Sequence, residues 1–159
     1  MLERRNDLIG KITAAQYLAE HSTEKKITQL YCGTLNGYTL AYYKGRVKSP
    51  HRVGCRWLLD QDVAYAGDRA IRLFIKMYGK ARIDSTLSAA EFVALCKNYM
   101  CLYPNDGKDM GTTRLHYMID SIRNGYAFIK DHCKSCDQPF IVHRDDATRR
   151  VCRLCNTAH

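Results

Sequence analysis

The sequence lacks any long apolar run. Within its 159 residues, no segment approaches the ~20 consecutive apolar residues that a bilayer-spanning helix requires. The first residues, MLERRNDLIGKIT, carry charges where a secretory signal would have its apolar core. We therefore expect a cytoplasmic protein with no membrane segment.

Acidic residues are absent from Lys25 to Leu59, in a chain with 25 basic and 16 acidic residues and a net charge of +9. The basic residues of this acid-free segment are Lys25, Lys26, Lys44, Arg46, Lys48, Arg52 and Arg56. Tyrosines and Trp57 lie between them. Such a surface suits a polyanion held through phosphate contacts. A solvated basic loop on an ordinary protein is the alternative.

Four of the eight cysteines lie close together in HCKSCDQPFIVHRDDATRRVCRLCN. They form two C-x2-C pairs, Cys133 with Cys136 and Cys152 with Cys155, separated by fifteen residues. Each pair can direct two thiolates at one ion, and Zn²⁺ accepts four thiolates tetrahedrally at ~2.3 Å. A reducing cytoplasm argues against disulfides. The spacing therefore predicts one bound Zn²⁺.

The predicted zinc site has no open coordination position, which makes it structural rather than catalytic. Metal binding contributes ~10–16 kcal/mol at pH 7 in zinc-finger peptides, enough to fold a segment too small to fold alone. Within this zinc ribbon we predict a strand at PFIVH, a turn at RDDAT and a return strand at RRVC. The residues expected to offset the thiolate charge are Lys134, Arg149, Arg150 and Arg153.

The remaining cysteines, Cys32, Cys55, Cys96 and Cys101, have no comparable spacing. Cys96 and Cys101 fall in a helical pattern, so we expect both to be packed in the core. Three histidines near the ribbon, His132, His143 and His159, are not needed as ligands when four thiolates are present.

Two short helices are expected at the start, over residues 6–21 and 24–33. In the first, Leu8, Ile12, Ala15 and Ala19 recur at helical spacing. In the second, the predicted buried face holds Ile27, Leu30 and Tyr31, with Lys25, Lys26, Thr28 and Gln29 outward. Ser22 or Thr23 is a suitable N-cap. The pair fits a helix-turn-helix whose second helix enters the major groove, where Gln29 can pair with adenine; any helical hairpin looks similar.

A short helix or strand over 38–43 and a basic connector to Trp57 follow. Three amphipathic helices are then expected within 60–79, 87–104 and 111–132, the second starting with the capping box Ser88-x-x-Glu91. Gly79 suits the C′ position of the first. The face of the third holds Leu115, Met118, Ile119, Ile122 and Tyr126, with Arg123 and Lys130 near its end.

The predicted fold is mainly α-helical, with a helix-turn-helix-like N-terminal region, a helical middle and a four-cysteine zinc ribbon containing a short β-hairpin. We expect residues 1–130 to bind DNA and a partner, and residues 131–159 to form the ribbon.

These features together resemble the FlhC family, the zinc-containing subunits of a bacterial transcriptional activator that works with the small helical protein FlhD. The likeness rests on ITQLYCGTLNG, on the Gly- and Pro-bearing basic connector, on NYMCLYP and on CKSC…FIVH…VCRLC. The chain is shorter than a typical member and lacks the basic tail after the last cysteine. It therefore looks like a divergent branch, such as those on conjugative elements.

The resemblance implies a non-enzymatic activator subunit that binds double-stranded promoter DNA together with an FlhD-like partner, near RNA polymerase. Flagellar and conjugative-transfer genes are both open as targets. We expect Lys25, Lys26 and Gln29 to read or flank bases. The expected phosphate contacts are Lys44, Arg46, Lys48, Arg52 and Arg56.

Two other functions stay open. One is a zinc-ribbon adaptor that binds protein or RNA. The other is a metal-dependent nuclease, which needs carboxylates or histidines around an open metal. The tight acidic pairs, Asp60 with Asp62 and Asp145 with Asp146, are instead expected at a helix start and in a turn.

Overall fold

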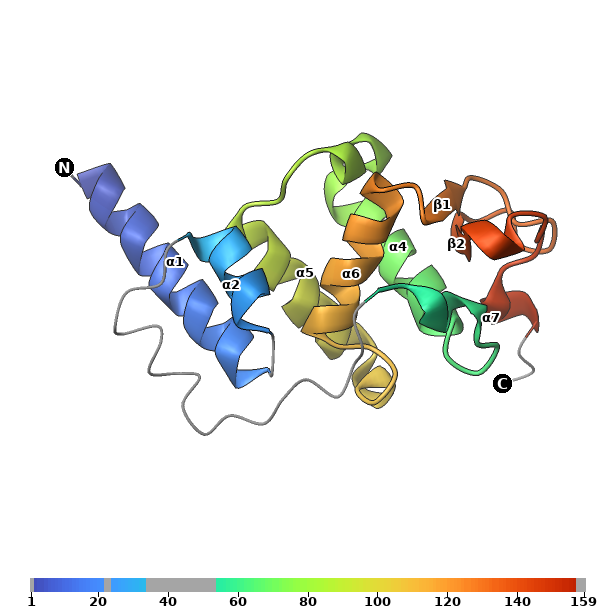
Figure 1. Cartoon of the computed structure of the whole chain (residues 1–159), viewed down its shortest axis with the longest axis horizontal. Coiled ribbons are helices and arrows are strands. Elements are labelled where there is room, and N and C mark those ends of the chain that lie inside the picture. Colours follow the sequence, from blue (N-terminus) through green and yellow to red (C-terminus); the bar gives the residue numbers. More distant parts are fainter. Residues whose placement is uncertain (1, 22–23, 34–53, 157–159) are drawn as a thin grey trace.

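The computed structural model describes residues 2–21, 24–33 and 54–156, with side chains described from Asp7 onward. The α-helices and strands are α1 (Leu2–Glu20), α2 (Lys25–Cys32), α4 (Tyr65–Tyr78), α5 (Ala89–Leu102), α6 (Thr112–Arg123), β1 (Ala127–Lys130), β2 (Phe140–His143) and α7 (Arg153–Asn156) (Figure 1). Short 3₁₀ helices are η1 (Arg56–Leu59), η2 (Lys80–Asp84), η3 (Pro104–Asp106) and η4 (Arg144–Asp146). The mainly helical fold with a C-terminal hairpin is confirmed. Whether the first helix pair acts as a helix-turn-helix stays a prediction.

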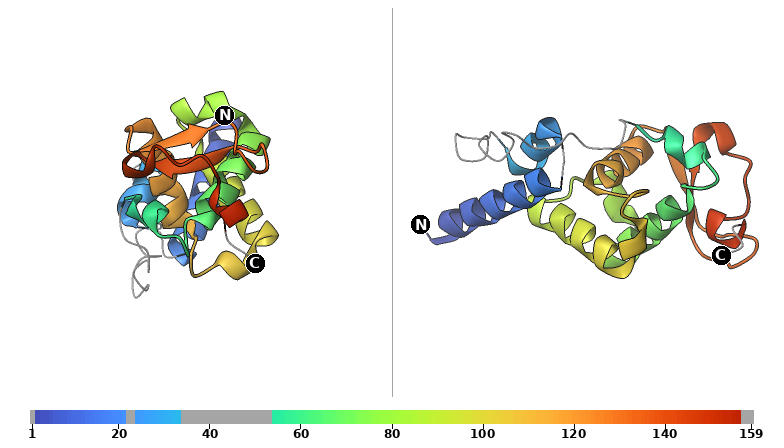
Figure 2. Two further views of the ribbon diagram at one scale, coloured as in Figure 1. Left: turned by 90° about the vertical axis from the view of Figure 1, so that its right-hand side faces the viewer. Right: turned by 90° about the horizontal axis from the view of Figure 1, so that it is seen from below.

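The molecule is elongated, with α1 and α2 at one end and the two strands with α7 at the other (Figures 1 and 2). Helix α1 packs on α5 and α2, while α4 joins α5 to β2 and α7. Three large, fully buried side chains of the core, Tyr99, Phe74 and Phe92, come from α4 and α5. Helix α4 therefore connects the helical body to the cysteine-bearing end.

The predicted buried face of α1 is correct only in its C-terminal half. Ala15, Leu18 and Ala19 are buried, whereas Leu8 is 53% exposed. The N-terminal half of the helix projects beyond α2 and α5, so nothing among the described residues covers it (Figure 2). Helical periodicity identified the apolar face of α1 but not how much of its length α2 and α5 cover.

The buried face of α2 is rotated from the one predicted. Ile27 and Tyr31 are buried as expected, but Thr28 is buried too and Leu30 is 61% exposed. Positions 27, 28, 31 and 32 make one stripe at 3.6 residues per turn. The N-cap is Glu24, without a side-chain cap bond. The N-cap candidates Ser22 and Thr23 and the element predicted over 38–43 lie outside the described residues.

Two predicted helix boundaries are confirmed. Gly79 follows α4 with φ of +83°, a conformation that favours glycine. At the start of α5, the Glu91 N–H donates to Ser88 Oγ at 3.2 Å, and the Ser88 N–H donates to Glu91 Oε2 at 2.7 Å. This is the predicted capping box. Cys96 is buried in α5, but Cys101 is exposed, so its predicted core position was wrong.

Gly67 permits a close approach in the middle of the molecule. A Cβ at this position of α4 would lie 2.7 Å from Leu58 Cδ2 and 3.1 Å from Ile141 Cγ2. Leu58 belongs to η1 and Ile141 to β2, and both are fully buried. The missing side chain lets these two elements pack directly on the helix.

The third predicted middle helix ends earlier than expected. Helix α6 stops at Arg123, and Gly125 takes a φ of +72° that ends the helical path. Lys130 then lies in β1, and Tyr126 is 47% exposed rather than part of a buried helical face. Leu115, Met118 and Ile119 are buried as predicted.

The predicted hairpin has the right first strand but the wrong partner. The FIVH segment forms β2, which pairs antiparallel with β1, with Ile129 opposite Ile141. RRVC is not a strand, because its backbone is hydrogen-bonded to the loop that carries the first cysteine pair. The Cys152 N–H donates to Cys133 Sγ at 3.2 Å, and the Arg150 carbonyl accepts from the Lys134 N–H at 2.9 Å.

Strand β2 is shared between two hydrophobic clusters, which explains why all its residues are buried. Ile141 packs in the main core. Phe140 and Val142 point to the other face and form a small second cluster with Cys133 and Cys152. The period-two alternation of a strand places these residues on opposite faces. The strand thus attaches the cysteine-bearing segment to the body.

Candidate metal centre

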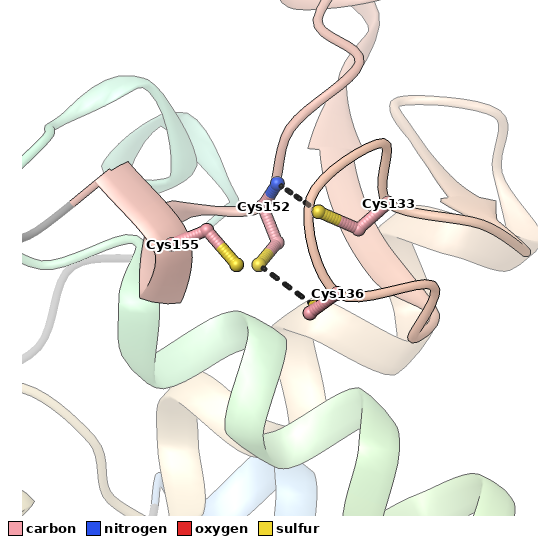
Figure 3. A group of neighbouring side chains, drawn as sticks. All are labelled: Cys133, Cys136, Cys152 and Cys155. Carbon is pink, nitrogen blue, oxygen red and sulfur yellow. Dashed lines mark hydrogen bonds between the residues drawn. The ribbon is translucent and has the colours of Figure 1, made fainter.

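Four sulfur atoms converge at the end of the molecule remote from α1. The Sγ atoms of Cys133, Cys136, Cys152 and Cys155 all lie within 4.8 Å of one another (Figure 3). The first pair comes from the loop between β1 and β2, while Cys155 lies in α7 and Cys152 just before it. Among the described residues, this is the only group of three or more His, Cys, Asp or Glu side chains close enough to hold a metal ion.

The sulfur spacing fits a tetrahedral thiolate site. Metal–sulfur bonds of ~2.3 Å in a tetrahedron place the sulfurs ~3.8 Å apart. The Cys136 and Cys152 Sγ atoms are 3.8 Å apart. A soft four-sulfur donor set suits Zn²⁺ and other thiophilic ions. The four residues can therefore hold one metal ion, with no open position for a substrate.

Backbone N–H groups support the thiolate form of Cys133. Its Sγ accepts from the Cys152 N–H at 3.2 Å and from the Ser135 N–H at 3.4 Å. Burial would raise the pKa of the Cys133 thiol, but hydrogen bonds, first from the backbone N–H groups of Cys152, Cys136 and Ser135, outweigh it and lower the pKa to about 6. A thiolate is the form that binds metal.

Arg72 of α4 contacts the sulfurs from outside. Its Nη2 lies 3.3 Å from Cys136 Sγ and 3.3 Å from Cys152 Sγ, so one nitrogen donates to both C-x2-C pairs. Its Nε donates to the Pro139 carbonyl at 2.9 Å. This guanidinium therefore places a positive charge beside the cysteines.

Asp68, one helical turn before Arg72, is fully buried against the same segment. Its Oδ1 accepts from the Ile141 N–H at 3.0 Å, and its Oδ2 accepts from the Arg153 N–H at 2.7 Å. Burial raises the pKa of this carboxyl, and the two N–H donors oppose the shift. One side chain thus holds β2 and the start of α7.

The cations predicted to offset the thiolates have other contacts. The Asp146 carboxylate lies 2.9 Å from Arg149 Nε and 3.3 Å from Arg153 Nη2. Arg149 also donates to the Ile141 carbonyl at 2.6 Å. Lys134 and Arg150 are exposed. Arg72, in contrast, donates to two of the cysteine sulfurs.

Neighbouring histidines and acidic pairs lie outside the sulfur group. His143 Nδ1 accepts from the Asp145 N–H at 3.1 Å, and His132 Nδ1 lies 2.9 Å from Asp137 Oδ1. His159 is outside the described residues. Asp145 and Asp146 lie in η4.

The other acidic pair lies just before α4. Asp60 Oδ1 accepts from the Asp62 N–H at 3.0 Å. Asp60 and Asp62 therefore lie between η1 and α4 and not at the start of the helix, and Asp145 and Asp146 lie in a 3₁₀ helix where a turn was expected.

The predicted DNA-contacting residues are only partly described. Lys25, Lys26 and Gln29 are exposed on α2, and Arg56 is exposed on η1. Lys26 Nζ lies 3.1 Å from Glu24 Oε2 and 5.6 Å from the centre of the Tyr117 ring. The remaining predicted contacts, Lys44, Arg46, Lys48 and Arg52, lie outside the described residues.

Sequence reasoning missed Asp68 and Arg72. The available signal was slight: an acid and a base four residues apart within a helix whose other residues are largely apolar. Such pairs are usually exposed intrahelical ion pairs. Only the packing of α4 on β2 and α7 shows that both face the cysteine-bearing segment.

The chain matches no family model and no curated protein sequence. In addition, none of the helices in the described segments is both long and apolar enough to cross a membrane.

Proposed function

We propose that the chain is a DNA-binding subunit of a transcriptional activator of the FlhC type, with one structural Zn²⁺ held by Cys133, Cys136, Cys152 and Cys155. It acts in the cytoplasm with an FlhD-like helical partner at promoter DNA, close to RNA polymerase. The observation that carries the proposal is the acid-free segment from Lys25 to Leu59, whose first helix directs Lys25, Lys26 and Gln29 to solvent.

The charge on α2 supports contact with a polyanion. Ile27, Thr28 and Tyr31 pack the helix on the body. Lys25, Lys26 and Gln29 on its other face are exposed. The pKa of Lys26 is raised, first by its hydrogen bond to Tyr117 and then by its hydrogen bond to Glu24. Glu24 competes with a phosphate for Lys26, which favours Lys25 as the stronger contact.

The metal centre contributes rigidity rather than chemistry in this proposal. A four-thiolate site has no open position. Bound metal would hold the cysteine loops on β2 and α4 and keep that end of the molecule in one shape.

Salt-dependent binding to a mixed-sequence 30-base-pair duplex tests the proposal, with and without a co-expressed FlhD-like partner. Each phosphate contact contributes about 0.9 to the slope of log K against log salt concentration. Lys44→Ala with Arg46→Ala should reduce the slope by about 2, whereas Lys25→Ala with Lys26→Ala should reduce it by about 1, because Glu24 already pairs with Lys26. The exposed Lys76 of α4 provides the control, Lys76→Ala, which should leave it unchanged. Unchanged slopes in both double variants would refute the assignment.

A second candidate, an adaptor that binds protein or RNA through the ribbon, is favoured by exposed aromatic side chains. Tyr126, just before β1, is 47% exposed, and Phe128, within β1, is 44% exposed. The Arg144 guanidinium lies 4.6 Å from the Tyr126 ring centre. Aromatic and arginine side chains of this kind stack on unpaired bases or anchor protein interfaces. This function predicts loss of partner binding in Phe128→Ala and no retarded duplex. Divalent-ion-dependent cleavage of the duplex would instead indicate a nuclease.

A further inference from the structure

Helix α4 contacts both halves of the cysteine-bearing segment through one side chain. The Arg72 Nη2 is equally distant, at 3.3 Å, from a sulfur of the first C-x2-C pair and a sulfur of the second. Its Nε holds the Pro139 carbonyl, which lies between the two pairs in sequence. Arg72 can therefore make both sulfur contacts only when the two C-x2-C pairs lie close together.

Asp68 fixes the position from which Arg72 acts. Residues four apart on a helix lie on the same face. Asp68 accepts from the backbone N–H groups of Ile141, which lies between the two pairs in sequence, and of Arg153, which lies within the second pair. Asp68 thus attaches α4 to the backbone of the cysteine-bearing segment, and Arg72 attaches it to the sulfurs.

The charges favour a loaded centre. Four thiolates around one divalent ion leave a negatively charged group in a partly buried place, where Coulomb interactions are stronger than in water. Arg72 remains protonated and directs N–H donors at two of the sulfurs. Hydrogen bonds to a charged partner are stronger than those to a neutral one, so Arg72 gains most from the ionised sulfurs.

We infer that Arg72 is an outer-shell positioning residue of the metal centre, and that it couples metal occupancy to the docking of α4 on the cysteine-bearing segment. Coupling is reciprocal, so metal should order α4, and the docked α4 should strengthen metal binding. The inference rests on the proposed metal site and is independent of DNA binding.

Metal affinity of the full-length protein tests the inference directly. Zn²⁺ is titrated in competition with a chromophoric chelator, using wild type, Arg72→Met and Arg72→Lys. Loss of an outer-shell partner typically weakens metal binding about 10–100-fold, and this is the expectation for Arg72→Met. Arg72→Lys should lose less affinity for Zn²⁺, because lysine keeps the positive charge. It lacks the planar guanidinium that donates to two sulfurs and to the Pro139 carbonyl.

Co²⁺ substitution separates a role at the sulfurs from a general role in folding. In Arg72→Met, the thiolate-to-cobalt charge-transfer bands should shift in energy because two sulfurs lose a hydrogen-bond donor. The ligand-field bands should keep their tetrahedral pattern. Hydrogen exchange in α4 should increase when wild type is treated with chelator, and increase less in Arg72→Met.

Two variants on the same helix are matched controls. Lys76→Met removes one exposed positive charge and should keep wild-type affinity. Arg69→Met breaks the 2.8 Å ion pair with Asp106, away from the sulfurs, and should lower stability without moving the cobalt bands. Equal Zn²⁺ affinity in Arg72→Met and Lys76→Met would overturn the inference. So would a loss in Arg69→Met as large as in Arg72→Met. If the wild-type protein bound neither Zn²⁺ nor Co²⁺, the metal site on which the inference rests would be refuted.

Discussion

The rings of Tyr31 and Phe92 lie parallel, with 4.1 Å between their centroids and 2° between their planes. Tyr31 belongs to α2 and Phe92 to α5, so this stack attaches the exposed basic helix to the core. The Tyr31 hydroxyl also lies 3.1 Å from Nδ1 of the buried His116. The position of α2 therefore depends on an aromatic cluster that contains a titratable group.

Acid should weaken this cluster through His116. Burial lowers the pKa of His116 below its usual 6.5, so the unfolded chain binds a proton that the folded chain does not. Stability should therefore fall as the pH drops below about 6.5, until the folded-state pKa is passed. His116→Phe should reduce this part of the pH dependence. The free energy of urea unfolding, measured from pH 7.5 to pH 5, checks it; identical pH slopes in the two proteins would contradict it.

Two glycine substitutions should have opposite effects on stability. Gly67→Ala should destabilise, because its Cβ would meet the buried Leu58 and Ile141 side chains. Overpacking of this kind costs about 1–3 kcal/mol. Gly10→Ala in α1 meets nothing within 4 Å and should stabilise by about 0.5–1 kcal/mol. Thermal unfolding of both variants provides the comparison, and a stabilised Gly67→Ala would show that the contact is more yielding than the geometry indicates.

Asp68→Asn should loosen the cysteine-bearing segment from α4. The amide keeps one acceptor oxygen, so one of the two N–H groups of Ile141 and Arg153 loses its partner. An unsatisfied buried donor costs about 1–3 kcal/mol. The exposed Asp84 supplies the control, Asp84→Asn, which should change the unfolding free energy by less than about 0.5 kcal/mol. Equal effects of the two changes would argue against the anchoring role.

Cys152→Ser should abolish metal binding and unfold the segment that follows β2. Cys152 is fully buried and its sulfur lies 3.8 Å from that of Cys136, so three thiolates cannot complete the tetrahedron. Native mass spectrometry with metal analysis measures the loss. Cys101→Ser, at an exposed cysteine outside the cluster, should retain one metal per chain. Retention by Cys152→Ser as well would exclude the four-thiolate site.

The cysteine cluster was predictable because its information is local. Two C-x2-C pairs bring four thiols together whenever the intervening chain folds back, whatever route that chain takes. The route itself was predicted wrongly. RRVC resembles a strand, but its backbone is bound by the first cysteine loop, and β1 comes from a segment that helical periodicity had assigned to the preceding helix.

The sequence by itself determined the four-cysteine group, the capping box at Ser88 and the glycine that ends α4 at Gly79, because each depends on residues close together in the chain. It also determined the acid-free basic segment, a property of composition alone. The tertiary structure decided which face of α2 is buried. It also decided that Asp68 and Arg72 contact the cysteine-bearing segment instead of forming an exposed ion pair along the helix. Those outcomes depend on which distant elements pack against a helix, and no local pattern of charge or hydrophobicity specifies that.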